Sequence, residues 1–214
     1  MYYTGRLPAD PLGRLFSTVS YARIIVFSEK AEAVKAIDRV NAIHGALENQ
    51  RGAAIPDWAY RDVLFMLIYY SIVSFELLEH KLTIAEREEV YDVFYRVGQH
   101  MHLTNLPANY TEWLTARKLH IETDLAKSLY TTDLFLQYKK HLGAYRYAVL
   151  KEAQKLVLPK TVKELLNFSN FSLLSPVVPA YKFSRRFKAD RIIKALLLPP
   201  KYKAQIADLD VQPA

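Results

Sequence analysis

The feature that most constrains the fold is the stretch from Arg14 to His44, which has the periodicity of two consecutive α-helices. In its first part, Arg14 and Thr18 are one helical turn apart, so their side chains point to the same side. In its second part, apolar residues recur at intervals of three and four around His44: Ile37, Val40, Ile43 and Leu47. This spacing places an imidazole beside the apolar stripe of a helix. A ring nitrogen there can bind a metal or a haem iron, or form a hydrogen bond inside a core.

Prolines and capping residues divide the rest of the chain into further helices. Thr83 with Glu86, and Thr161 with Glu164, have the spacing of a capping box. Other side chains suited to begin a helix are those of Asp10, Ser28, Asp57, and Thr131 or Thr132. The expected helices cover about residues 12–27, 28–49, 57–75, 83–102, 111–128, 131–156, 161–166 and 181–198.

Signals of β-structure are absent from the sequence. No stretch alternates convincingly between apolar and polar residues, and there is no Asn-Gly or Asp-Gly hairpin turn. We therefore expect an all-α fold, a multi-helix bundle of about eight helices in which residues 1–214 form a single domain.

The composition excludes several classes of chemistry. The 214 residues contain no cysteine, which excludes disulfides, zinc–thiolate sites, iron–sulfur clusters and covalent haem attachment through CxxCH. The longest uncharged run, Val63–Phe75, has 13 residues and is too short to span a bilayer. The N-terminus lacks the pattern of a signal peptide, so we expect a cytoplasmic protein.

Common catalytic and phosphate-binding motifs are also missing. The sequence has no GxGxxG, GxxxxGK(S/T), HExxH or GxSxG, and no glutamate three residues before a histidine. Two pairs remain as alternative metal ligands, namely Glu76 with His80 and His100 with His102. Both pairs are expected near helix ends, where solvated histidines are common, so a metal site at either pair is disfavoured.

A basic amphipathic segment lies near the C-terminus. Its apolar residues include Phe183, Phe187 and Ile192. Such a helix can make a peripheral contact with an anionic membrane, but a packed helix with a solvated basic face is the favoured interpretation. Nucleic-acid binding is disfavoured because no recognised binding motif accompanies the charge. The cations of this segment are Lys182, Arg185, Arg186, Lys188, Arg191, Lys194, Lys201 and Lys203.

The stretch around Arg14 and His44 resembles a known family. It has an Arg-Leu-x-x-Thr start at Arg14–Thr18, an apolar helix ending in Phe27-Ser28, an alanine-rich helix and then Ile43-His44. This order is similar to the MpaB-type oxygenase family, which includes the latex clearing protein (rubber oxygenase). A weaker likeness continues at residues 82–98 and 196–200.

The resemblance implies an all-helical fold with a globin-like core and a non-covalently bound haem b. His44 matches the iron ligand of the family, and Arg14 and Thr18 match polar residues of its haem pocket. Family members with known activity use dioxygen to cleave carbon–carbon double bonds of isoprenoid chains. An apolar small molecule is therefore the substrate class that the resemblance implies.

The residues alone leave other interpretations open. His44 also fits a core histidine satisfied by a carbonyl, and Arg14 fits a surface arginine paired with the acid one turn earlier. Thr18 fits a helical threonine that bonds back to a backbone carbonyl. The adjacent Tyr69 and Tyr70 fit either a cavity lining or a core position whose hydroxyls reach the edge.

The chain also differs from the family pattern. Ser17 stands where the latex-clearing branch has a lysine, no glutamate precedes Arg14, and the region Phe65–Ser71 lacks a histidine that many members have. The chain is also expected to be N-terminally short relative to the family. We therefore expect a haem b-dependent oxygenase acting on an unsaturated apolar, isoprenoid-like substrate. The alternative is a non-catalytic helical protein that binds haem or an apolar ligand, with or without a membrane surface.

Overall fold

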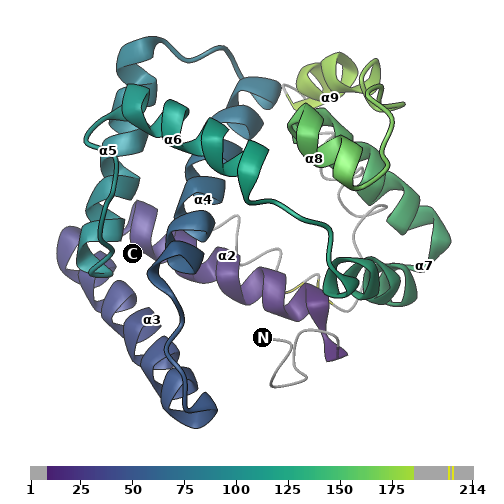
Figure 1. Ribbon diagram of the computed structural model, residues 1–214. Helices are drawn as coiled ribbons and strands as arrows, with labels where there is room; N and C mark the ends of the chain where they lie inside the picture. Colours follow the sequence, from purple (N-terminus) through teal and green to yellow (C-terminus); the bar gives the residue numbers. More distant parts are fainter. Residues whose placement is uncertain (1–8, 186–201, 203, 205–214) are drawn as a thin grey trace. The chain divides into compact units, whose positions relative to one another are not determined.

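The computed structural model describes residues 9–185, 202 and 204, and within these residues it contains eight α-helices and no β-strand (Figure 1). The all-α prediction and the expected number of helices are thus confirmed. A globin-like core stays a prediction. The helices are α2 (Pro11–Phe27), α3 (Lys30–Arg51), α4 (Asp57–Leu78), α5 (Ile84–His100), α6 (Tyr110–Thr123), α7 (Leu129–Val157), α8 (Lys160–Leu165) and α9 (Val177–Arg185).

Two of the predicted helix starts are confirmed by side-chain caps. Asp10 precedes α2, and its Oδ1 accepts a hydrogen bond from the Gly13 amide at 3.1 Å. Thr83 and Glu86 form the predicted capping box of α5, with Thr83 Oγ1 accepting from the Glu86 amide at 3.2 Å and Glu86 Oε2 accepting from the Thr83 amide at 2.7 Å.

Three predicted starts were wrong. Glu29, rather than Ser28, is the N-cap residue of α3, and it makes no side-chain cap. Ser128 begins α7 in place of Thr131 or Thr132, because Thr131 completes a capping box in the role that glutamate usually takes. The Thr161–Glu164 box does not form, since α8 already begins at Lys160, directly after Pro159.

The C-terminal half of the chain departs further from the expected pattern. Gly143 interrupts α7 with a φ of 74° and a ψ of 169°, a conformation that a residue with a side chain rarely adopts. The last helix was expected over 181–198, but α9 covers Val177–Arg185 and so begins earlier. The remaining predicted part, 186–198, lies outside the described residues.

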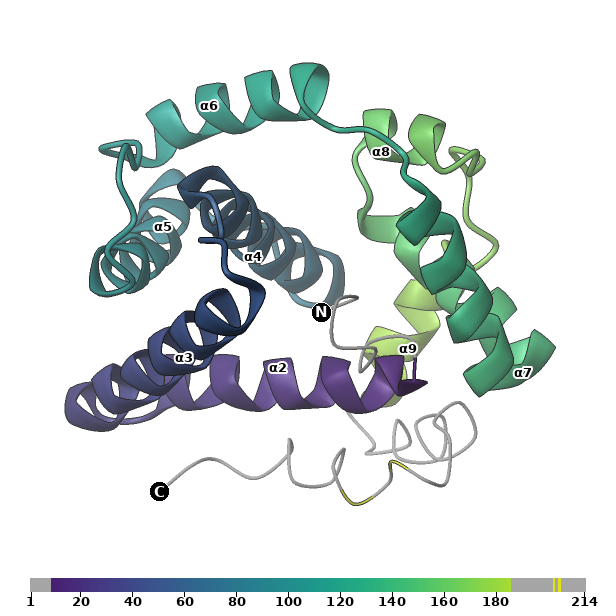
Figure 2. The ribbon, with the colours of Figure 1, turned by 60° about the horizontal axis from the view of Figure 1, so that its bottom comes forward.

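The chain divides into two compact units. The first contains the N-terminal half of α2 together with α7, α8 and α9; the second contains the C-terminal end of α2 and most of α3 to α6. In the first unit, α8 lies beside α7 (Figures 1 and 2). The Ser172 hydroxyl after α8 also donates to the Glu152 carbonyl of α7 at 2.7 Å. The single domain expected from the sequence stays a prediction.

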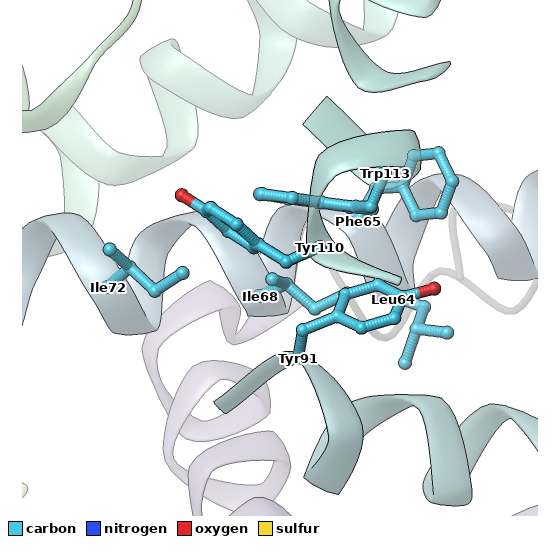
Figure 3. Packing of buried hydrophobic residues seen from close by; sticks show 7 residues of the cluster. All are labelled: Leu64, Phe65, Ile68, Ile72, Tyr91, Tyr110 and Trp113. Carbon is cyan, nitrogen blue, oxygen red and sulfur yellow. The ribbon is translucent and has the colours of Figure 1, made fainter. Parts of the chain in front are cut away.

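The hydrophobic core of the second unit is formed by α4, α5 and α6 (Figure 3). Ile68 has no exposed surface and Trp113 is 1% exposed, so these two side chains are its centre. The Phe65 ring meets Trp113 edge-on, with the ring centroids 6.3 Å apart. The other members of the cluster are Leu64, Ile72, Tyr91 and Tyr110.

Candidate haem-ligand site

His44 lies in the second half of α3, and its ring is half buried. The apolar periodicity that singled it out is only partly used for packing, since Ile37 is buried whereas Ile43 is exposed. The imidazole packs against Tyr60 of α4, with ring centroids 5.1 Å apart and an angle of 48° between the planes. Its Nδ1 is buried and has no hydrogen-bond partner in the described part of the chain. His44 therefore carries a shielded ring nitrogen whose bonding capacity is unused.

Glu48, one turn after His44, fixes the neighbouring loop and ring. Its Oε1 accepts hydrogen bonds from the Tyr60 hydroxyl at 3.1 Å and from the Ile55 amide at 2.8 Å. Burial, with a further contribution from Glu48, raises the pKa of Tyr60 to about 12. Tyr60 is therefore a protonated donor at neutral pH, held in place beside the His44 ring.

The electrostatics favour a neutral imidazole at this position. Burial lowers the pKa of His44, and the charge of Glu48 opposes that effect. A neutral imidazole has one nitrogen lone pair available, and this is the form that binds metal ions and haem iron. The residues present thus fit a haem ligand in their protonation state and in the unused Nδ1.

Arg14 and Thr18 lie one turn apart on α2, as the spacing predicted. The Thr18 hydroxyl donates to the Arg14 carbonyl oxygen at 3.0 Å, which confirms the bond back to the backbone. The Thr18 side chain is exposed. Arg14 and Thr18 belong to the first unit and His44 to the second, so a pocket built from all three stays a prediction.

The alternative metal pairs gain no support from the structure. Both Glu76 oxygens are occupied, because Oε1 accepts from Arg87 Nη2 at 2.6 Å and Oε2 accepts from Lys81 Nζ at 2.8 Å. His100 and His102 are both exposed. Among the residues that the structure describes, no three His, Asp or Glu side chains form a group that could hold a metal ion.

Sequence reasoning missed several residues that surround the candidate sites. Glu48 was within reach of a local argument, because its spacing from His44 places both on one helix face. Tyr60 packs against His44, and Arg117 lies over the Tyr69 ring. Both contacts join residues of different helices, so sequence spacing gave no signal for either. The Asp62–His120 pair, with Nε2 and Oδ1 at 2.7 Å, likewise joins α4 to α6.

The basic C-terminal segment is only partly described. Lys182 and Arg185 lie in α9, whereas Arg186, Lys188, Arg191, Lys194, Lys201 and Lys203 lie outside the described residues. Between the two described cations, Phe183 is exposed. None of the described helices combines the length and the hydropathy needed to cross a membrane.

Comparison with known families decides the membership of the chain. The family described as "ER-bound oxygenase mpaB/B'/Rubber oxygenase, catalytic domain" matches residues 3–188. The chain belongs to this oxygenase family. No curated protein and no solved structure matches the chain. The match covers all of α2 to α9, so the fold, His44, Arg14 and Thr18 all lie within the oxygenase catalytic domain.

Proposed function

We propose that this member of the oxygenase family uses haem b to oxidise an unsaturated apolar, isoprenoid-like small molecule. The observation that carries the proposal is the half-buried imidazole of His44, whose buried Nδ1 has no partner among the described residues. Membership of an oxygenase family supports the reaction class. Haem b, when bound, supplies the iron at which dioxygen is activated.

Under this proposal His44 is the residue that holds the iron. The lowered pKa of His44 keeps the imidazole neutral, so that it offers a lone pair without first losing a proton. The Tyr60 ring, fixed by Glu48, limits rotation of the imidazole and shields one of its sides from water. Glu48 is thus a positioning residue.

Arg14 and Thr18 have secondary roles in the proposal. The Arg14 guanidinium suits a haem propionate, which it can bind through two parallel hydrogen bonds. The Thr18 hydroxyl already donates to the Arg14 carbonyl, so toward a ligand its oxygen acts as an acceptor. The proposed task of Arg14 is therefore to hold the cofactor through a propionate, whereas Thr18 lines the pocket without binding the propionate.

The reaction class can be tested with matched hydrocarbons. Cleavage of a double bond by dioxygen is balanced when one alkene and one O₂ give two carbonyl groups. We expect the haem-loaded protein to consume oxygen with squalene, a polyene, and not with squalane, its saturated counterpart. Mass spectrometry should detect carbonyl products, and His44→Ala should abolish them while His80→Ala, at an exposed histidine, should not. Oxygen uptake that is equal for both hydrocarbons, or absent for both, would contradict the proposal.

A second candidate function is haem binding without turnover. The observation that favours it is Ser17, which stands where the latex-clearing branch has a lysine, and which is exposed on α2. A stable haem spectrum combined with no oxygen uptake on squalene would select this candidate over the oxygenase.

A further inference from the structure

Arg117 of α6 is a half-buried cation without a carboxylate partner in the described residues. Its Cζ lies 3.5 Å from the centroid of the Tyr69 ring and 5.9 Å from that of Trp113. Burial lowers the pKa of Arg117, and the groups that oppose this effect are the neighbouring tyrosines rather than an acid. A desolvated guanidinium with no counter-charge is costly, so a bound anion would stabilise it.

Arg87 of helix α5 is a second arginine near this core, and unlike Arg117 it is paired with a carboxylate. Its Nη2 and Nε donate to Glu76 Oε1 at 2.6 and 3.1 Å. Glu76 is shared between Arg87 and Lys81, and the side-chain groups that act on the pKa of Arg117 are tyrosines and not Glu76. The two arginines therefore differ in kind, because Arg87 closes a structural ion pair whereas Arg117 retains an unmatched charge.

Arg117 has more donors than its contact with Tyr69 can use, since the side-chain hydrogen bond that acts on its pKa is with Tyr69. The guanidinium carbon lies 3.5 Å from the Tyr69 ring centroid, and a guanidinium carries five N–H donors in its plane. Burial raises the pKa of both Tyr69 and Tyr70, so their hydroxyls remain protonated donors at neutral pH. One guanidinium and two phenols suit a monoanion with two acceptor oxygens, which describes a carboxylate.

An exposed apolar stripe runs along α4 to Tyr70, the neighbour of Tyr69. Val63, Met66 and Leu67 are 48%, 44% and 37% exposed, and together with Tyr70 they follow the i, i+3, i+4, i+7 spacing of one helix face. This face lies opposite the one that packs into the core. A helix that is apolar on both faces is usually covered on both. From Val63 to Tyr70 the stripe is about 10 Å long. It ends at Tyr70, whose ring centroid lies 5.1 Å from that of Tyr69, the ring beneath Arg117.

We infer that this part of the protein binds a long-chain fatty acid, with the carboxylate on Arg117, Tyr69 and Tyr70 and the chain along Val63, Met66 and Leu67. The residues involved all lie on α4 and α6 of the second unit. The inference does not depend on haem, and the failure of either proposal leaves the other standing.

The test is calorimetric titration of the full-length protein with oleate, below the concentration at which oleate self-associates, and with oleyl alcohol as the uncharged counterpart. We expect Arg117→Met to weaken oleate binding about tenfold or more, because a charged hydrogen-bonding partner is lost, and to leave the alcohol unaffected. Arg96→Met is the matched control, since Arg96 is exposed and paired with Asp92. It should change neither affinity.

A second variant keeps the inference testable if Arg117→Met fails to fold. Leu67→Glu places a carboxylate on the exposed stripe without entering the core, so it should weaken the binding of oleate and of the alcohol alike. Circular dichroism checks the fold of each variant. The inference is overturned if oleate does not bind the wild-type protein, if Arg117→Met binds it as tightly as the wild type, or if Leu67→Glu leaves its affinity unchanged.

Discussion

Helices α4 and α7 are the longest apolar-rich helices of their respective units, but they are packed very differently. Helix α4 has 22 residues and buries Leu64, Phe65, Ile68 and Ile72, whereas α7 has 29 residues and buries none fully. Several large apolar side chains of α7 are exposed instead, namely Leu129, Tyr130, Leu136 and Tyr145. Length and hydrophobic content therefore do not decide which helix carries the tertiary packing.

The difference has identifiable causes in the sequence. In α4 the uncharged run Val63–Phe75 lets one face pack continuously against α5 and α6. Gly98 of α5 allows close approach, because a Cβ there would lie 2.8 Å from side-chain carbons of Leu64 and Leu106. In α7, by contrast, the non-helical conformation of Gly143 interrupts the helix, so the apolar residues before and after it do not form one continuous face. We expect tertiary stability to be concentrated in the second unit, which also contains His44 and Arg117.

The largest effect should come from the aromatic core. Trp113→Ala removes a side chain that is 1% exposed, and we expect it to lower the free energy of unfolding by about 3–5 kcal/mol. Tyr145→Ala removes an aromatic ring from the exposed surface of α7 and should change the free energy of unfolding by less than about 0.5 kcal/mol. Urea denaturation measures both. Equal losses in the two variants would remove the contrast between the units.

The ion-pair cluster at Glu76 should give the next largest effect. The Glu76 side chain is 7% exposed. Glu76→Gln leaves Arg87 without its counter-charge, so we expect it to lower the free energy of unfolding by about 2–4 kcal/mol at pH 7. The exposed pair of Glu32 with Lys35 provides the control, for which Glu32→Gln should cost less than about 0.5 kcal/mol. Denaturant melts at constant pH compare the two variants.

The pH dependence of the Glu76 contribution follows from its pKa. Hydrogen bonds from Lys81 and Arg87 lower the pKa of Glu76 to about 2 against the opposing effect of burial, while an unfolded chain has the ordinary value near 4.5. Because the folded-state pKa is the lower one, this stabilisation is complete above about pH 5 and is lost as the pH falls toward 2. Glu76→Gln should flatten the stability curve in that window. A wild-type curve already flat between pH 5 and 2 would show that Glu76 is not held as described.

The smallest effects should come from the two capping boxes. Thr83→Ala removes the cap of α5, a helix that packs into the core, and should lower global stability by about 1 kcal/mol. Ser128→Ala removes a cap with longer hydrogen bonds from α7, and we expect less than half of that loss. Faster amide hydrogen exchange at the start of α7 should accompany it. Similar global losses would indicate that α7 contributes to the core more than its exposure suggests.

Local signals made much of the helical pattern predictable. The start of α2 and the capping box of α5 follow from residues within one turn of the helix start, so they could be read from the sequence. The cap of α7 was missed because Thr131 replaces the usual glutamate, and the break at Gly143 because a single glycine in a helical pattern is often tolerated.

The candidate sites were predictable only where one helix carries the information. His44 stands out through its apolar spacing and the Ile43-His44 pattern, and the Arg14–Thr18 contact follows from their separation on α2. Tyr60 beside His44, and Tyr69 beneath Arg117, depend on how separate helices pack, which periodicity does not specify.

Haemin titration followed by absorption spectroscopy is the decisive experiment on His44 as the iron ligand of a haem-binding oxygenase domain. We expect a Soret band that saturates at one haemin per chain in the wild type and in His80→Ala, and that is lost or shifted in His44→Ala. If the wild type takes up no haemin stoichiometrically, or if His44→Ala titrates like the wild type, this role of His44 is contradicted.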